Sequence, residues 1–215
     1  MSDNRKSLKS QYSFKLWSFI SFNFILFWMI LVSKDINIAE IIQFEKYLNA
    51  KNGIIAALAP IISIVLNGLL SSNAKVILVF WRIKYPLPGS RVFSDLAKKD
   101  LRINLEKIRE KYGYLPEGHA KQNHLWYKIY KIHESKITIL DSHKNYLFCR
   151  DLTGISAIFL TIFTIFTLIF VGAQVSIFYY ILYLFIQFLI LSIAAQNYGN
   201  RFVCNVLAEE SANLP

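Results

Sequence analysis

The chain has 215 residues, 54% of them hydrophobic, and a formal net charge of +10. Most of the apolar residues fall in four runs, at 14–33, 54–72, 154–171 and 176–195, which contain no charged residue or histidine except Lys15. Runs of this kind exclude a water-soluble domain, because each has about the 20 residues that a helix needs to cross a bilayer. The sequence predicts an all-α, polytopic membrane protein with four transmembrane helices.

The charges between these runs predict the orientation of the chain. The net charge is +3 for residues 1–15, zero for 34–51, +7 for 82–151 and −1 from residue 196 to the end. Lys and Arg are enriched on the cytoplasmic side of membrane proteins, so we expect residues 82–151 and both termini in the cytoplasm. The abundance of Ile, Phe, Lys and Asn is compatible with an AT-rich bacterial genome. We therefore expect a multi-pass protein of the bacterial cytoplasmic (inner) membrane.

Residues 82–151 are predicted to form a helical cytoplasmic insert between the second and third spans, within a single membrane domain of residues 1–215. Tyr85-Pro86-Leu87-Pro88-Gly89 should end the helix that continues from the second span, because two prolines and a glycine break it. Four helices are expected in the insert: a short one capped by Ser90, one opened by Asp100 and stopped at Gly113, one over residues 119–133, and one from about Lys136 into the third span.

No pattern in the sequence predicts catalysis or cofactor binding. The histidines are spaced by five, nine and ten residues, whereas helical metal sites favour His-x-x-x-His, so we expect no metal site. Asp141, Ser142 and His143 are adjacent and cannot reproduce a catalytic triad, whose members come from separate elements. Cys149 and Cys204 both fall on the reducing side of the membrane, which argues against a structural disulfide. We therefore expect a protein that has no cofactor and is not an enzyme.

A basic and aromatic stretch in the insert is the first candidate binding site. It comprises Lys121, Trp126, Lys128, Lys131 and Lys136. Lysines near a membrane attract anionic lipid headgroups, and together with aromatic rings they can also hold a nucleic acid or a nucleotide. Membrane lipids are the favoured partner, a cytoplasmic protein is the main alternative, and a nucleic acid is disfavoured.

Polar and small residues inside the spans form the second candidate site. They are Thr161, Thr164 and Thr167 in the third span, and Asn67 and Gly68 in the second. Such residues either line a polar pore or pack helices together through hydrogen bonds and close backbone contacts, and packing is the favoured interpretation. The small residues of the second span place it at the centre of helix packing, and we expect a homo-oligomer.

Four spans, a basic helical insert between the second and third, and short loops elsewhere form the layout of this chain. This layout resembles the small four-span membrane proteins of bacterial antiphage systems, such as the membrane subunit of the Kiwa system and the four-span pore effectors of nucleotide-signalling cassettes. The resemblance covers the layout and transfers no residue, and it implies a role in antiviral defence.

The favoured hypothesis is a non-enzymatic membrane scaffold or effector that oligomerises and couples to a cytoplasmic partner or signal. The first alternative is a small ion channel whose pore is lined by the third span. The second is a membrane enzyme that modifies lipids through His or Cys residues.

Overall fold

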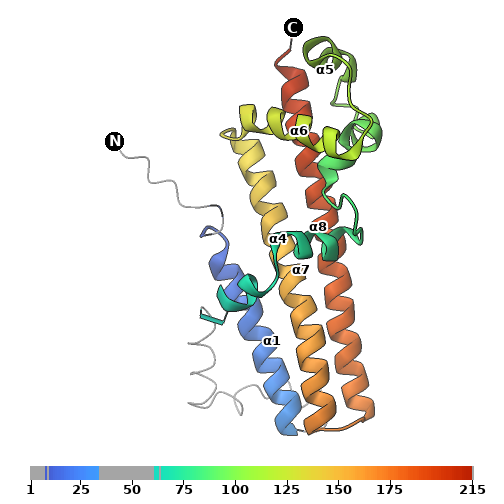
Figure 1. Cartoon of the computed structure of the whole chain (residues 1–215). Helices are drawn as coiled ribbons and strands as arrows, with labels where there is room; N and C mark the ends of the chain where they lie inside the picture. The colour runs from blue at the N-terminus through green and yellow to red at the C-terminus, as the bar shows by residue number, and fades with distance from the viewer. Residues whose placement is uncertain (1–7, 9, 34–60, 63, 215) are drawn as a thin grey trace, which may run out of the picture. The chain divides into compact units, whose positions relative to one another are not determined.

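The computed structural model describes residue 8 and residues 10–33, 61–62 and 64–214. These residues form helices, turns and loops, and no strand occurs among them. Three helices are long and apolar enough to cross a membrane (Figure 1). They are α1 (Ser13–Ser33), α7 (Ile137–Phe170) and α8 (Val175–Ala212). The apolar runs predicted as the first, third and fourth spans lie in these helices.

The predicted second span lies partly outside the described residues. Residues 61–62 and 64–69 are helical, but residues 54–60, the predicted outer end of this span, fall outside the described part, as does the loop at 34–51. The prediction that the second span continues as one helix toward Tyr85 is wrong. The helix is interrupted at residues 70–71, and a separate helix, α4 (Ser72–Phe80), follows.

The chain divides into two compact units, to which α7 and α8 both contribute. Unit 1 comprises Met1–Ser71 and Asp151–Leu191, and unit 2 comprises Ser72–Arg150 and Ser192–Pro215. The helix predicted to begin near Lys136 and run into the third span is confirmed, since α7 is continuous from Ile137.

Phenylalanine rings form the contact between α1 and α7 in unit 1. Phe27 stacks on Phe163 with ring centroids 4.1 Å apart, and Phe163 stacks on Phe159 at 4.6 Å. Phe24 meets both of these α7 rings edge to face, at 5.6 Å from Phe159 and 5.3 Å from Phe163. A polar link joins α1 to α8, where Gln187 Nε2 donates to Asn23 Oδ1 at 3.2 Å. Such aromatic packing and interhelical hydrogen bonding hold helices together where lipid is the solvent.

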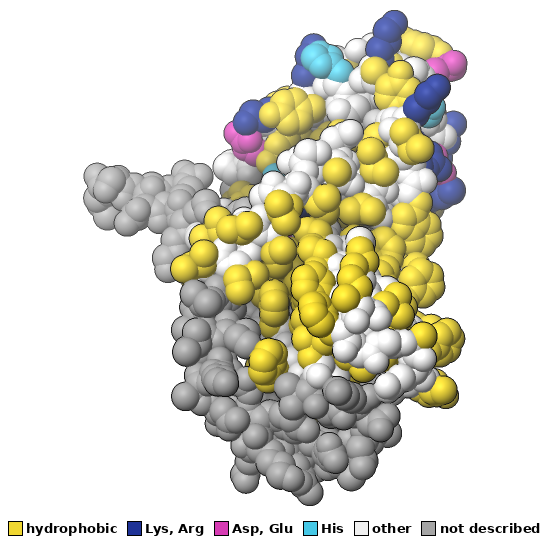
Figure 2. All heavy atoms as spheres, turned by 60° about the horizontal axis from the view of Figure 1, so that its bottom comes forward, with side chains coloured by type: hydrophobic (Ala, Val, Ile, Leu, Met, Phe, Trp, Pro, Cys, Tyr) yellow, Lys and Arg dark blue, Asp and Glu magenta, His cyan; other side chains and the backbone are white. Residues whose placement is uncertain are grey.

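The outward faces of the long helices carry large apolar side chains. In unit 1 these side chains include Phe22 of α1, Ile169 of α7 and Phe178 of α8, which are between 54% and 70% exposed. Figure 2 shows one face of the molecule, where hydrophobic side chains cover a broad continuous area and the charged side chains gather elsewhere. An apolar surface of this extent suits a lipid environment rather than water.

Unit 2 combines α4 with a series of short turns and helices. A 3₁₀ turn (Pro88–Arg91), a π-helical turn (Val92–Leu96) and a second 3₁₀ turn (Ala97–Lys99) precede α5 (Leu105–Tyr112) and α6 (His119–His133). The ends of α7 and α8 complete the unit. The predicted bounds of α6 and the stop at Gly113, which has a φ of +77°, are confirmed.

Two predicted helix starts in unit 2 are wrong. Ser90 lies inside the first 3₁₀ turn instead of capping a helix. Asp100 does not open α5, because its carboxylate is held by Arg102, at 2.9 Å from Nε and 2.7 Å from Nη2. The N-cap of α5 is Asn104, whose side-chain oxygen accepts hydrogen bonds from the backbone N–H groups of Glu106 and Lys107. An N-cap side chain satisfies backbone donors that have no partner in the first turn of a helix.

The last residues of the chain extend α8 instead of forming a tail, a feature that the sequence analysis did not predict. Phe202, Val203, Val206 and Leu207 are buried at helical spacing, so the helix gains apolar burial by continuing into unit 2. The side chain of Gln196 also donates to the backbone oxygen of Val79 at 2.7 Å, near the end of α4. Unit 2 thus contains α4, residues 82–150 of the predicted insert and the C-terminal part of the chain.

Candidate functional site

Aromatic rings from three helices meet in the core of unit 2. Trp126 and Tyr130, four residues apart on α6, stack with their centroids 5.6 Å apart. Phe202 of α8 stacks on His143 of α7, with ring centroids 4.7 Å apart and an interplanar angle of 5°. It meets Trp126 edge to face, with centroids 5.5 Å apart. The indole N–H of Trp126 donates to the backbone oxygen of Val203 at 3.2 Å, which satisfies its only donor. These contacts fix the aromatic faces relative to one another.

A cavity of about 400 Å³ opens beside this cluster, and we call it the aromatic cavity. Its lining includes all four rings above with Tyr127 and Tyr146, the turn at Leu87–Gly89, and the polar side chains of Asn73, Asn123 and Arg150. A volume of this size lies within the range of small-molecule binding sites, about 300–1,000 Å³. Among the described residues that line it there is no carboxylate.

Gly89 and Asn123 form a tight contact in the wall of the aromatic cavity. A Cβ atom at Gly89 would lie 2.5 Å from Asn123 Oδ1 and 3.1 Å from the Trp126 ring, so only glycine fits at this position without a shift of its neighbours. Asn123 Oδ1 is itself buried and finds no hydrogen-bond donor within the described residues. Buried acceptors in proteins are nearly always paired, and Asn123 Oδ1 is one of several buried side-chain atoms that lack a partner within the described residues.

The position of α6, which carries Asn123 and Trp126, is fixed by Gln122. This side chain is fully buried, and its oxygen accepts hydrogen bonds from the backbone N–H groups of Phe93 and Ser94. Its Nε2 donates to the backbone oxygen of Glu117 at 2.7 Å. Gln122 therefore connects α6 to the π-helical turn and to the loop before α6. These contacts fix the part of the cavity wall that α6 contributes.

His143 is a neutral histidine in the wall of the aromatic cavity. Burial, together with the positive charge of Arg150, lowers its pKa from the usual 6.5 to about 4. Its Nδ1 lies 3.2 Å from the hydroxyl of Tyr130. At neutral pH the imidazole is uncharged and acts as a flat ring stacked on Phe202.

The lowered pKa of His143 makes the stability of unit 2 sensitive to acid. Between pH 6.5 and about 4 the unfolded chain binds a proton at His143 that the folded chain does not, so stability falls as the pH drops through this window. Tyr130 and Phe202 face the ring, and burial raises the pKa of the Tyr130 hydroxyl further above that range. We expect the thermal midpoint of the wild-type protein to fall more between pH 7 and pH 4.5 than that of His143→Phe. If the thermal midpoints of the two proteins fell by the same amount between pH 7 and pH 4.5, this account would be contradicted.

A buried carboxylate holds the end of α8 against α5 and α6. Glu210 is 1% exposed, and its oxygens accept hydrogen bonds from Lys111 at 2.6 Å, Tyr112 at 2.9 Å and His133 at 2.5 Å. Burial acts to raise the pKa of Glu210, but the hydrogen bonds from Lys111, His133 and Tyr112 outweigh it and hold the pKa below its usual value. The carboxylate is thus ionised at neutral pH.

Two further contacts join the C-terminal residues to α5. The hydroxyl of Ser211 accepts a hydrogen bond from the backbone N–H of Asn104 at 2.9 Å. Lys107 Nζ donates to the backbone oxygen of Leu214 at 3.1 Å. The C-terminal end of α8 is therefore an integral part of unit 2.

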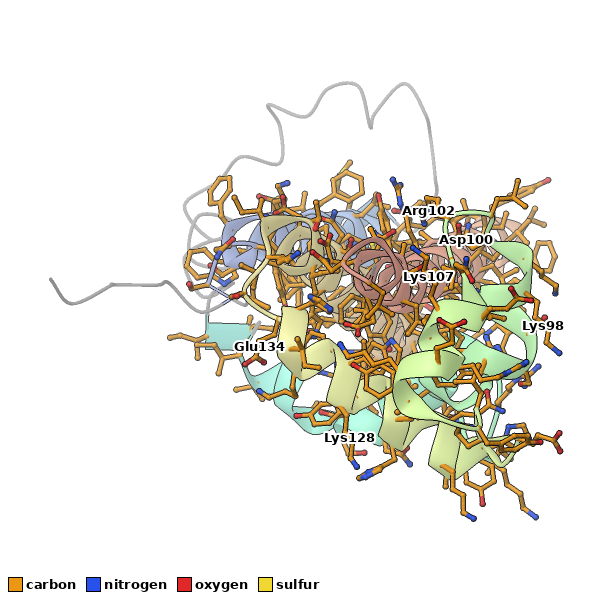
Figure 3. The ribbon with its side chains drawn as sticks, turned by 90° about the horizontal axis from the view of Figure 1, so that it is seen from above. Lys98, Asp100, Arg102, Lys107, Lys128 and Glu134 are labelled. Atoms are coloured by element: carbon orange, nitrogen blue, oxygen red, sulfur yellow. The ribbon has the colours of Figure 1, made fainter. Side chains whose placement is uncertain are left out.

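The structure separates the residues of the predicted basic and aromatic site. Trp126 is buried in the core and lines the aromatic cavity. Lys131 pairs with Glu134 and Lys136 pairs with Glu209, so two of the four lysines are neutralised by carboxylates. Lys121 and Lys128 are exposed, and neither pairs with an acidic residue in the described part of the chain. Figure 3 shows Lys128 pointing away from the neighbouring helices.

The predicted polar residues of the third span do not share one environment. Thr161 is exposed and Thr164 is half-buried, while Thr167 is fully buried and donates to the backbone oxygen of Phe163 at 2.8 Å. The hydroxyl of Thr161 also bonds to its own helix, at the backbone oxygen of Ala157. Two of these hydroxyls are thus engaged by carbonyl groups of α7.

The two predicted residues of the second span also differ. Asn67 is buried, and its Nδ2 donates to Asp151 at 3.1 Å. Gly68 is exposed, and among the described residues a Cβ atom placed there would meet nothing within 4 Å. The described part of the chain therefore shows no close helix contact at Gly68, and the predicted packing role of this residue stays a prediction.

Three polar residues were missed by the sequence analysis: Asp151, Asn123 and Glu210. Asp151 is 1% exposed in unit 1, where it accepts hydrogen bonds from Asn67 and from the hydroxyl of Tyr12 at 3.0 Å. The sequence offered a signal only for Glu210, which follows Val203, Val206 and Leu207 at helical spacing and so falls on the buried stripe.

The described residues contain no group of three or more His, Cys, Asp or Glu side chains that could hold a metal ion. Comparisons with known proteins complete this description of the chain. No family model, curated protein or solved structure matches this chain.

Proposed function

We propose that this chain is a non-enzymatic scaffold or effector of the bacterial cytoplasmic membrane, in which unit 2 couples to a cytoplasmic partner. In this proposal residues 54–72 form a fourth span, and both termini and unit 2 lie in the cytoplasm. The charge pattern along the sequence supports this orientation, because the segment at residues 82–151 carries a net charge of +7. The proposal includes assembly of several copies through the spans, and a role in antiviral defence rests on the resemblance in layout alone.

The single observation that carries the proposal is the continuity of α7 and α8. Each is one unbroken helix that contributes residues to both units. Because each helix is continuous, a shift or rotation of its residues in unit 1 can be passed along its backbone to the residues that it contributes to unit 2. This connection suits a protein that transmits a change between the membrane and a cytoplasmic partner.

The partner surface in this proposal is the exposed face of α6 around Lys121 and Lys128. Their positive charges have no carboxylate partner within the described residues, so they are available to an acidic protein surface. Lys131 and Lys136 already form ion pairs and contribute less net charge. An exposed charge of this kind mainly steers association and selects the partner.

Charge reversal at this face tests the proposal. A photo-crosslinker placed at His124, an exposed residue of α6 between the two lysines and outside the lining of the aromatic cavity, is expected to capture one acidic protein in intact cells. Lys121→Glu with Lys128→Glu should reduce this crosslink at least tenfold while membrane insertion is unchanged. The matched control is Lys84→Glu with Lys98→Glu, which changes the charge of unit 2 equally at exposed positions, and Lys98 lies apart from Lys128 in Figure 3. Crosslinks to phospholipid alone, or equal loss in the control, would reject the protein partner.

A further inference from the structure

We infer that the aromatic cavity binds a planar nitrogen heterocycle carrying an N–H donor, of the size of a nucleoside or nucleotide. The key juxtaposition is an unpaired buried amide oxygen, Asn123 Oδ1, among the aromatic rings of the lining. The aromatic cavity is separate from the exposed face of α6 that carries Lys121 and Lys128, since neither lysine lines the cavity. The inference therefore does not depend on the proposed protein partner.

The walls of the aromatic cavity suit a flat ring system. Trp126, Tyr127, Tyr130, Tyr146 and Phe202 all contribute to a lining that encloses about 400 Å³. Aromatic side chains bind nucleobases by stacking, whatever the identity of the base. The contacts between Trp126, Tyr130 and Phe202 hold these rings in place before any ligand arrives, so little order has to be created on binding.

The amide of Asn123 supplies a directional contact. Its Oδ1 is buried without a donor in the described part of the protein, and it lies close to Gly89. A buried acceptor left without a partner is unfavourable, and a ligand that brings an N–H group removes this penalty. Amino and ring N–H groups on the edges of nucleobases have this chemistry.

Arg150 and Asn123 in the lining disfavour the other ligands that commonly bind in an aromatic pocket. Quaternary ammonium groups also bind in aromatic cages, but they are cations and carry no N–H group. Among the described residues of the lining Arg150 is the one charged side chain, and its positive charge disfavours a cation and suits a ligand that bears a phosphate. A lipid acyl chain would leave Asn123 Oδ1 unpaired. A nucleoside or its monophosphate matches both the aromatic walls and the polar groups.

Equilibrium dialysis of the full-length protein in nanodiscs tests this inference. The probes are the four common ribonucleosides, their 5′-monophosphates and phosphocholine. We expect one-to-one binding of at least one nucleoside or monophosphate, and at least a tenfold weaker affinity in Asn123→Leu and in Tyr127→Ala. Tyr127 is 50% exposed, so its removal should leave unit 2 folded. Tyr114→Ala, at a residue that is 76% exposed and outside the lining, is the control expected to bind as the wild type does.

Thermal stability separates a binding role of Asn123 from a structural one. Replacing an unpaired buried acceptor by an apolar group of similar size should leave the melting temperature unchanged or raise it. Asn123→Leu should therefore be as stable as the wild type and yet lose binding. The inference is overturned if no nucleoside or monophosphate binds the folded wild type at millimolar concentration. Unchanged affinity in both variants, or preferential binding of phosphocholine, would overturn it equally.

Discussion

Replacing Phe159 by alanine is expected to lower the free energy of unfolding by about 3 kcal/mol, near the lower end of the range for buried Phe→Ala changes. The ring is 1% exposed and contacts Phe19, Phe24 and Phe163. In a bilayer the lost transfer energy is small, because lipid tails are as apolar as the protein interior, so the loss of packing contacts accounts for most of the effect. Denaturation of the reconstituted protein by SDS measures this change in the free energy of unfolding.

Phe178→Ala is the control for this change. Phe178 is 64% exposed on α8, and the one ring contact described for it is with its neighbour Tyr179. Its ring faces a similar surrounding in the folded and unfolded states, so we expect a change of less than about 1 kcal/mol. If both variants lost the same stability, the aromatic contact between α1 and α7 would not be the source of the effect.

Glu210→Ala is expected to have the second large effect, a loss of about 3 kcal/mol in unit 2. The variant removes the acceptor of three hydrogen bonds and leaves the buried side chain of His133 without its carboxylate partner. Because Glu210 joins α8 to both α5 and α6, the C-terminal residues should also detach. Hydrogen exchange of residues 203–212 reports this directly, and faster exchange is the expected result.

The neighbouring Glu209 provides a matched control for Glu210. It forms one ion pair, with Lys136 at 2.5 Å, and the two side chains are 26% and 40% exposed. Ion pairs at this level of exposure contribute at most about 1 kcal/mol. Glu209→Ala should therefore leave hydrogen exchange in α8 nearly unchanged. Equal effects of the two substitutions would show that burial of Glu210 does not stabilise the end of the helix.

The membrane helices follow from local properties of the sequence, which is why they could be predicted. Length and the absence of charge are sufficient to identify the apolar parts of α1, α7 and α8. The bounds of α6 were also predictable, because a proline and a glycine precede it within a few residues. The start of α5 was not, since Asp100 and Asn104 are both good caps and the choice depends on the contact of Asp100 with Arg102.

The candidate site depends on contacts between distant residues, which no local pattern contains. The aromatic cavity brings together Trp126, His143 and Phe202 from three helices, and their spacing along the chain gives no sign of contact. The close approach of Gly89 to Asn123 joins residues 34 positions apart, and only the folded chain shows it. The basic stretch was visible in the sequence, and Lys131 and Glu134 are only three residues apart. The pairing of Lys136 was not predictable, because its partner Glu209 belongs to the other end of the chain.

Labelling of single cysteines on intact cells tests the central claim that unit 2 is the cytoplasmic part of a membrane protein. The native Cys149 and Cys204 are buried, so they should contribute little background. A cysteine at Asn37, in the predicted outer loop, should react with a membrane-impermeant maleimide in intact cells. A cysteine at the exposed Glu117 of unit 2 should react only after the cells are permeabilised. Labelling of Glu117→Cys but not of Asn37→Cys in intact cells would contradict the account.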